Sequence, residues 1–353
     1  MPGRPTARPS ASHNPSIPPP ATIQFRHIST ATVWLCQLAT GLTLLFSSFT
    51  KANDPLGMTI MLKDYLMVAG IHTGYASVPV TACVILLTFA EAAIGISLLI
   101  GACRRRTAWL LLLFMAPMLI VTAVNAATDA VPECGCFGSA IHLTNTESFL
   151  KNIVLTLAAV WLFIRHDSMY RLGGRHLRAM VANIVVVSAV ILALWSWRNL
   201  PPVDFTPYKT GTDILSAMMG EYDVVNGQSV EIKAPTILDF GLTDEEGNDR
   251  TDEILMAEKP VTLITIPSAQ AADTGNADRL NALWDEARDK GEAFYIVMAE
   301  GKEAAEYFKD CTGLGCPALY ASLEMLQTIV RANPGIVRIT AGQITEKSAV
   351  SNL

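Results

Sequence analysis

Five long apolar runs limit what this chain can fold into. They contain almost no charged residue and lie at residues 28–49, 78–101, 107–127, 149–164 and 179–197. A helix needs about 20 apolar residues to cross the roughly 30 Å hydrocarbon layer of a bilayer. Core helices of water-soluble proteins are seldom so uniformly apolar, so the runs predict five transmembrane helices with the lipid bilayer as a partner.

The charged residues divide the chain into two parts. Residues 1–197 carry 13 Lys and Arg against 7 Asp and Glu, whereas residues 198–353 carry 13 against 25. Such a split indicates two regions in different solvents, with a water-soluble domain at the C-terminal end. The acidic balance of that domain argues against nucleic acid as a partner, because nucleic acid binding rewards clustered positive charge.

The basic residues also predict the orientation of the helices. Ten arginines lie before the first run, between the second and third runs, and between the fourth and fifth, whereas the other loops hold only Lys51 and Lys63. Cytoplasmic loops are enriched in Lys and Arg. We therefore expect a multi-pass protein of the bacterial inner (cytoplasmic) membrane, with a cytoplasmic N-terminus and a periplasmic C-terminal domain. Residues 1–27 are rich in proline, serine and arginine and predict a disordered cytoplasmic tail.

The loop at residues 51–77 predicts a helix lying on the outer leaflet. Asp54-Pro55 is a typical helix start, because proline is accepted in the first turn, and apolar residues follow at partly helical spacing. We expect this helix to cap the bundle, with a substrate or quinone role as the alternative.

The segment Cys134-Gly135-Cys136 carries the sharpest chemical signal. Two cysteines one residue apart can close only a very small disulfide ring, and Gly135 removes the side chain that would obstruct it. Such a ring departs from relaxed disulfide geometry and is easily reduced, as catalytic disulfides are. Three interpretations stay open: a redox pair, a tight turn whose cysteines only pack, and a metal site that adds His142. Without a second cysteine pair at zinc spacing, we predict no metal.

Glu91 is a carboxylate inside the second apolar run. A carboxylate at that depth is costly and is usually paired or functional. The other charge inside the runs, Lys151, sits near the end of the fourth run and could snorkel to the headgroups, so the sequence shows no second buried charge to pair with Glu91. We interpret Glu91 either as a proton-handling group or as a hydrogen-bond anchor to Asn125, Thr122 or Ser97.

These segments resemble a known membrane family. The runs KANDPLGMTIMLKDYL and ECGCFGSAIHLTNTESFLKNIVL, with Glu91 between them, look like DoxX-like membrane proteins and more closely like the branch of the methylamine-utilisation protein MauE. The resemblance covers residues 28–166 and implies a four-helix bundle, to which residues 167–198 add a cytoplasmic loop and a fifth helix. It implies a role in maturing a disulfide-rich periplasmic enzyme subunit, with Cys134 and Cys136 as the redox pair. Glu133 and Ser139 stand where we would expect aspartates.

The C-terminal part predicts an α/β domain. Residues 199–257 form a proline-rich linker and an irregular acidic segment, with short strands at residues 222–225 and 229–232. Residues 258–353 then alternate strands with helices and end in a hairpin, which indicates a βαβ unit followed by a hairpin. This order resembles the thioredoxin fold, with Pro334 where that fold keeps its cis-proline.

The cysteines of this domain depart from the thioredoxin pattern. The position of the thioredoxin Cys-x-x-Cys reads SAQAAD. Cys311 and Cys316 stand apart from it, and we expect a structural disulfide between them; a redox partner for Cys134 and Cys136, or two free thiols, are the alternatives.

The fold class we predict is a membrane all-α, DoxX-like four-helix bundle with a fifth transmembrane helix, followed by a thioredoxin-like α/β domain. The leading hypothesis for function is a membrane thiol–disulfide oxidoreductase that passes electrons to a quinone or a membrane partner and acts on a periplasmic client protein. One rival is a non-catalytic scaffold that binds a periplasmic partner. Another is a subunit of a quinone-linked respiratory enzyme.

Overall fold

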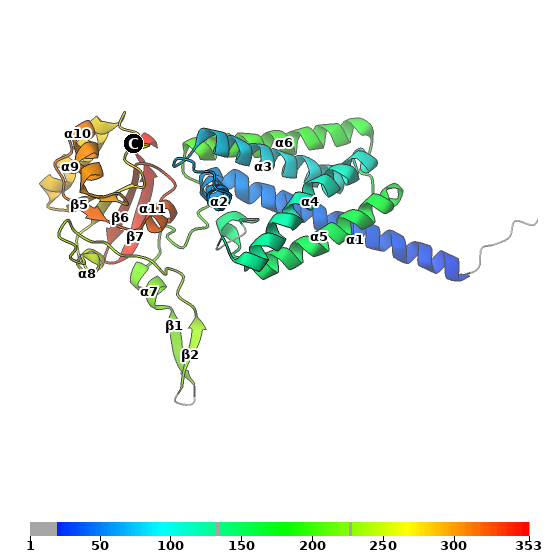
Figure 1. The fold of residues 1–353 in the computed structure, drawn as a ribbon, viewed down its shortest axis with the longest axis horizontal. Helices are drawn as coiled ribbons and strands as arrows, with labels where there is room; N and C mark the ends of the chain where they lie inside the picture. The colour runs from blue at the N-terminus through cyan, green and yellow to red at the C-terminus, as the bar shows by residue number, and fades with distance from the viewer. Residues whose placement is uncertain (1–19, 132–134, 226–227, 353) are drawn as a thin grey trace, which may run out of the picture.

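Five long helices form the first part of the computed structural model, which describes residues 20–131, 135–225 and 228–352 (Figure 1). Each is long and apolar enough to cross a membrane, so the chain is a multi-pass membrane protein and the five predicted runs are confirmed. The helices are α1 (Pro20–Asn53), α3 (Val78–Ile100), α4 (Arg104–Thr128), α5 (Asn145–Ile164) and α6 (Arg175–Arg198).

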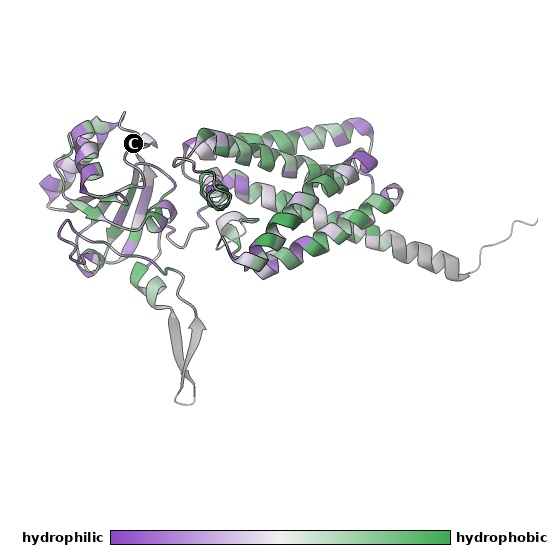
Figure 2. Cartoon of the chain, in the orientation of Figure 1, coloured by the Kyte–Doolittle hydropathy of each residue, from purple (hydrophilic) through white to green (hydrophobic). Residues whose placement is uncertain are grey.

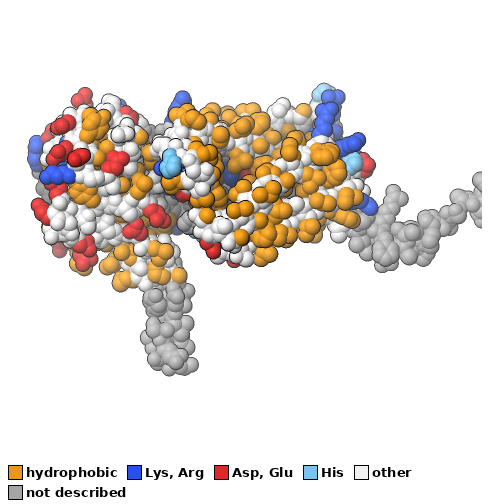
Figure 3. All heavy atoms as spheres, in the orientation of Figure 1, with side chains coloured by type: hydrophobic (Ala, Val, Ile, Leu, Met, Phe, Trp, Pro, Cys, Tyr) orange, Lys and Arg blue, Asp and Glu red, His pale blue; other side chains and the backbone are white. Residues whose placement is uncertain are grey.

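The bundle is held by two long helix pairs. Helix α1 packs along α3, and α4 packs along α5, while α6 packs against both α3 and α1. Large apolar side chains such as Leu86, Leu113 and Leu157 are exposed. The helices of the bundle are mostly hydrophobic along their length (Figure 2), and hydrophobic side chains cover much of the face of the bundle that Figure 3 shows. An outward apolar surface is what a lipid environment requires. Because α6 packs against α3 and α1, the fifth helix is part of the bundle.

The start of α1 differs from the prediction for the tail. Residues 1–19 lie outside the described residues, but α1 begins at Pro20, so the expectation of disorder over residues 1–27 is wrong for residues 20–27. Proline is accepted in the first helical turn, because the backbone N–H that it lacks has no partner inside the helix there. The helix therefore begins at the proline and continues without a break into the apolar run.

A short helix crosses the end of the bundle that carries the α/β domain, which we call the domain end. Helix α2 (Pro55–Val68) is seen along its own axis in Figure 1 and so runs across the bundle axis. The Asp54 carboxylate accepts a hydrogen bond from the backbone N–H of Gly57 at 2.8 Å, which confirms the predicted helix start. Met58 and Thr59 of α2 are buried, so the helix packs on the rest of the protein and the predicted capping helix is present.

The C-terminal part is a five-stranded α/β sheet with the order β5-β4-β3-β6-β7. Strands β3, β4 and β5 are parallel, and β6 and β7 follow as an antiparallel pair, which is the thioredoxin-like arrangement that we predict. The Asn333–Pro334 peptide bond before β6 is cis, as expected. The strands are β3 (Val261–Ile266), β4 (Ala293–Met298), β5 (Ala318–Tyr320), β6 (Gly335–Thr340) and β7 (Gln343–Ala349).

The sheet has a hydrophobic core on each face. Strand β3 is buried along its whole length, as expected for a central strand covered on both sides. Leu263 packs in the core that includes α11 (Leu323–Ile329), whereas Ile264 packs in the core of α9 (Ala277–Lys290) and α10 (Lys302–Thr312). Successive side chains of a strand point to opposite faces of the sheet, so neighbouring residues of β3 pack in different cores.

Shorter elements join the bundle to the sheet. A two-stranded hairpin of β1 (Glu221–Val225) and β2 (Gln228–Lys233) confirms the two short strands that we predict and projects away from the sheet (Figure 1). Helices α7 (Ile214–Met219) and α8 (Thr251–Leu255) and strand β5 are not among our predictions. They span at most two helical turns or three strand residues, which is too short for a hydrophobic period to show.

Replacing Gly335 by alanine will destabilise the α/β domain. A Cβ atom at this position would lie 2.4 Å from Cγ1 of Val330 and 2.7 Å from Oγ1 of Thr265. Overpacking of this kind costs about 1–3 kcal/mol. We expect Gly335→Ala to lower the thermal unfolding midpoint of the purified protein, whereas Gly241→Ala, where a Cβ meets nothing within 4 Å, leaves it nearly unchanged. Equal midpoints for the two variants would contradict this packing.

Candidate functional site

The loop between α4 and α5 lies at the domain end of the bundle. Cys134 and Glu133 lie outside the described residues, whereas Cys136 is described and is only 7% exposed. Gly135 has φ +65°, and a Cβ atom there would lie 2.8 Å from Sδ of Met61 in α2. Gly135 therefore fits for two reasons, its backbone conformation and the close approach of the capping helix.

A buried cluster of three side chains holds this loop, and we call it the lysine cluster: Ser47 and Lys51 of α1 and Glu91 of α3. Lys51 Nζ lies 3.0 Å from both carboxylate oxygens of Glu91 and donates to the Cys136 carbonyl oxygen at 2.9 Å and to Ser47 Oγ at 2.5 Å. Ser47 Oγ donates to the same carbonyl oxygen at 2.7 Å. The Lys51 and Glu91 side chains are 2% and 1% exposed.

The lysine cluster corrects two predictions. Lys51 is not a loop residue, because α1 continues two residues beyond it and turns its side chain into the bundle. Glu91 is not anchored by Asn125, Thr122 or Ser97; it is paired with Lys51, the second buried charge that the apolar runs did not show. A buried ion pair needs further hydrogen bonds to offset the loss of water, and Ser47 and the Cys136 carbonyl supply them here.

Asn125 fixes the start of the same loop. Its side chain accepts a hydrogen bond from the backbone N–H of Val131 and donates to the Val131 carbonyl, both at 3.0 Å. It also donates to Asn145 Oδ1 at 2.6 Å. The loop is therefore attached at Val131 as well as at Cys136, so both sides of the undescribed residues 132–134 are fixed.

A small cavity lies beside Cys136. It measures about 20 Å³ and is lined by Glu91, Cys136, Phe137 and Lys151, among other residues of α1, α4 and α5. A volume of that size holds about one water molecule. Lys151 Nζ lies 4.3 Å from the centre of the Phe137 ring, and Phe137 in turn packs on Phe46 at 5.4 Å between ring centres. The cavity thus brings a carboxylate, an ammonium group and the cysteine to one place.

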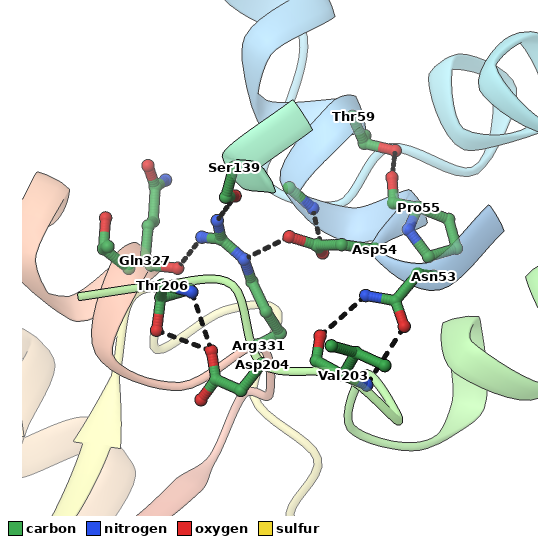
Figure 4. Close-up of polar contacts among 12 residues, drawn as sticks. Asn53, Asp54, Pro55, Thr59, Ser139, Val203, Asp204, Thr206, Gln327 and Arg331 are labelled. Carbon is green, nitrogen blue, oxygen red and sulfur yellow. Dashed lines mark hydrogen bonds and ion pairs between the residues drawn. The ribbon is translucent and has the colours of Figure 1, made fainter. Parts of the chain in front are cut away.

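The α/β domain reaches this site through one arginine. Arg331 Nε lies 2.9 Å from Oδ2 of Asp54, and its Nη2 lies 3.3 Å from Oγ of Ser139 (Figure 4). The Arg331 and Asp54 side chains are about nine-tenths buried. Ser139 follows Cys136 by three residues, and Arg331 precedes the cis-proline Pro334 by three. Arg331 therefore joins the cis-proline loop both to Asp54, through this interdomain ion pair, and to the loop of Cys136, through its hydrogen bond to Ser139.

The segment at the thioredoxin dithiol position is bonded to the cis-proline loop and faces the bundle across a cavity. The backbone carbonyl of Ser268 accepts a hydrogen bond from Asn333 Nδ2 at 2.8 Å, and the backbone N–H of Asp273 donates to the Asn333 carbonyl at 3.0 Å. A cavity of about 190 Å³ separates this region from the bundle; it is lined by Tyr75, Trp197, Asp273, Arg331 and Pro334, among others. The cis-proline face of the domain is thus covered by the bundle of the same chain.

Cys311 and Cys316 do not form the disulfide that we expect. Both are free thiols: Cys311 is exposed on α10, and Cys316 is buried in the core beneath α9 and α10. Burial raises the pKa of the Cys316 thiol to about 11. A thiol that stays protonated at neutral pH is a poor nucleophile, so Cys316 acts as a small core residue.

Among the described residues, no group of three His, Cys, Asp or Glu side chains is placed to hold a metal ion. The alternative of a metal site formed with His142 includes Cys134, which lies outside the described residues.

Comparison with known proteins agrees with the membrane part. Residues 29–165 match the family described as methylamine utilisation protein MauE, which is the span of the resemblance noted in the sequence. No curated protein matches. One solved structure, the solution structure of a "putative protein disulfide isomerase from Bacteroides thetaiotaomicron", is 19% identical, with a TM-score of 0.26, over 33% of this chain and 77% of that chain.

Sequence reasoning missed four residues of the site: Ser47, Lys51, Asp54 as an ion-pair partner, and Arg331. The spacing of Ser47 and Lys51, four residues apart in a helical register with the lysine at the end of an apolar run, is a signal that could have found the first two. Arg331 is paired with a residue 277 positions earlier, and no local pattern predicts such a contact.

Breaking the interdomain ion pair will loosen the domain from the bundle. Arg331→Gln removes one partner of a mostly buried pair, which costs on the order of 3 kcal/mol. We expect faster limited proteolysis of residues 199–213 in Arg331→Gln and in Asp54→Asn, which keeps the helix-capping oxygen. Exchanging the charges, Asp54→Arg with Arg331→Asp, will restore part of the protection. Unchanged cleavage in both single variants would contradict the role of this pair.

The two thiols of the α/β domain will differ in reactivity. Because Cys316 is buried and its pKa is about 11, an alkylating reagent at pH 8 should modify Cys311 within minutes and Cys316 only after unfolding. Peptide mass spectrometry of non-reduced protein will report both sites. A Cys311–Cys316 disulfide, or equal labelling rates, would contradict the structure.

Proposed function

We propose that this protein is an inner-membrane thiol–disulfide oxidoreductase that takes part in maturing a disulfide-rich periplasmic protein. Cys134 and Cys136 are the exchanging pair, and the domain end of the bundle faces the periplasm, in line with the distribution of arginines in the loops. The match of residues 29–165 to the MauE family supports a maturation role.

One observation carries the proposal: the loop of Cys136 is fixed by a buried charged cluster. The Cys136 carbonyl accepts two hydrogen bonds from Lys51 and Ser47, and Lys51 is paired with Glu91 inside the bundle. A turn whose cysteines only pack would not need an ion pair in the membrane, where charge is costly. Ionisable groups around a cysteine are a common way of setting its reactivity.

The proposed reaction balances as an ordinary exchange. A thiolate of the client attacks one sulfur of the Cys134–Cys136 disulfide, the S–S bond breaks, and a mixed disulfide forms. A second client thiolate then releases the reduced pair and leaves the client with a disulfide. Two electrons and two protons pass from the reduced pair to an acceptor, for which we propose a lipid-soluble quinone.

A quinone would need the bundle to adjust. The cavity between Glu91 and Cys136 holds only about one water molecule, and Phe114 and Met118 of α4 line it. Methionine is flexible enough to move aside for a planar ring. Purified protein that carries bound quinone, or reduces added quinone, would support this part of the proposal; a preparation that does neither would exclude it.

A membrane scaffold is the second candidate. It is favoured by the segment at residues 267–273, which has no cysteine, and by the covered cis-proline face of the α/β domain. In this case the soluble domain would bind a periplasmic partner, and the cysteines would only shape the loop.

Trapping of the cysteines in membranes distinguishes the two candidates. Cells are quenched with acid, free thiols are alkylated, and the fraction of Cys134 and Cys136 in a disulfide is measured by mass spectrometry. We expect a disulfide during aerobic growth that dithiothreitol reduces, and a dithiothreitol-sensitive adduct with a client in Cys134→Ser or Cys136→Ser. A fully reduced pair that resists oxidant, together with full function of the double serine variant, would select the scaffold.

A further inference from the structure

The lysine cluster does more than position a carbonyl oxygen. Glu91 and Cys136 line the same water-sized cavity. Lys51 is bonded to both Glu91 and the backbone of Cys136. Three groups that can carry charge, Lys51, Glu91 and the Cys136 thiol, therefore share one buried site.

We propose that Glu91 accepts the proton of the Cys136 thiol while Lys51 remains positive as the counter-ion of both. This inference rests on the proposed function and assigns the proton in it. The S–H bond breaks, an O–H bond forms on Glu91, and the negative charge moves from carboxylate to sulfur, either directly or through one water molecule in the cavity. Glu91 is thus a catalytic residue, and Lys51 and Ser47 are positioning residues.

The physical advantage of this arrangement is that the net charge of the buried site does not change during the proton transfer. Forming a thiolate in a buried site normally adds an uncompensated charge, which is expensive. Here the site is neutral before the transfer, as Lys51 with Glu91, and neutral after it, as Lys51 with the thiolate. The cost of removing Lys51 and one anion from water is already met in the folded protein, so the thiolate forms without a new burial cost.

The other charged groups around the cavity are few among the described residues. Helix α5 supplies Lys151, whose ammonium group lies over the Phe137 ring. Helix α4 lines the cavity with Phe114, Met115 and Met118, which carry no charge. The Asp54–Arg331 pair approaches through Ser139 and is itself neutral.

The proposal predicts opposite effects of two neutralising substitutions. Lys51→Gln removes the counter-ion, so the Cys136 thiolate forms only at higher pH. Glu91→Gln leaves Lys51 without its carboxylate, so the thiolate becomes the preferred partner and forms at lower pH. If the two residues only hold the loop in place, losing either will disturb the loop in the same way, and the two shifts will have the same sign.

The test measures the pH dependence of alkylation in the full chain. Every variant carries Cys134→Ser, so that Cys136 is the single thiol of its loop. The protein is purified in lipid nanodiscs, reduced with dithiothreitol and desalted, and its reaction with iodoacetamide is followed from pH 5 to 10. Mass spectrometry of the peptide that contains Cys136 gives the rate at each pH, and the unfolding midpoint shows that each variant is folded.

We expect Lys51→Gln to raise the pH midpoint of Cys136 alkylation by at least about one pH unit, and Glu91→Gln to lower it. Each unit corresponds to about a tenfold change in the alkylation rate at a fixed pH. Lys51→Arg keeps the positive charge, so its alkylation midpoint should stay near that of the wild type. This variant still tests the proposal if Lys51→Gln does not fold. Lys151→Gln is the matched control, with a smaller shift than Lys51→Gln because Lys151 is not bonded to the cluster.

Midpoints that coincide, or that move in the same direction in Lys51→Gln and Glu91→Gln, would overturn the proposal. So would a Lys51→Arg midpoint that follows Lys51→Gln. The measurement needs no client and no electron acceptor. If the cysteine pair never cycles between disulfide and dithiol in cells, the proposed function is wrong. The pH titration still tests the proton assignment in that case.

Discussion

The ion pair between Lys51 and Glu91 is the interaction on which the candidate site depends. It joins α1 to α3, the two helices that pack along each other, and its lysine also donates a hydrogen bond to the Cys136 carbonyl. Removing one partner of such a pair leaves a buried charge without compensation, which is more costly than losing the pair as a whole. The pair therefore links the stability of the bundle to the position of a single loop.

The second connection runs from the α/β domain to that loop. Asp54 has two roles, since it caps α2 and pairs with Arg331, and α2 in turn packs its methionines on Gly135. A displacement of the α/β domain would consequently move both α2 and Ser139, which lie on two sides of Cys136. The soluble domain and the membrane bundle form one structural unit around the loop, where the sequence alone indicated two regions joined by a linker.

The architecture could be predicted from the sequence because its signals lie in residues that are neighbours in the chain. Apolar runs of about 20 residues and alternating strands and helices are properties of neighbouring residues, and they predicted the five helices and the sheet. The cis-proline was expected from the resemblance to the thioredoxin fold. The site was harder, because its contacts are distant in sequence. Lys51 was assigned to a loop from its charge, although a lysine can lie at the end of a membrane helix when a carboxylate on another helix meets it. The expected Cys311–Cys316 disulfide failed because Cys316 points into a core.

The covered cis-proline face restricts how this protein can meet its surroundings. In a domain of this topology, the loops around β3 and β6 form one edge, and here that edge lies against α2 and the end of α6. A protein that binds the α/β domain would find that edge already occupied and would have to use another surface of the domain. A dithiol in the segment at residues 267–273 would face the chain's own helices, which makes its absence consistent with how the two parts are joined.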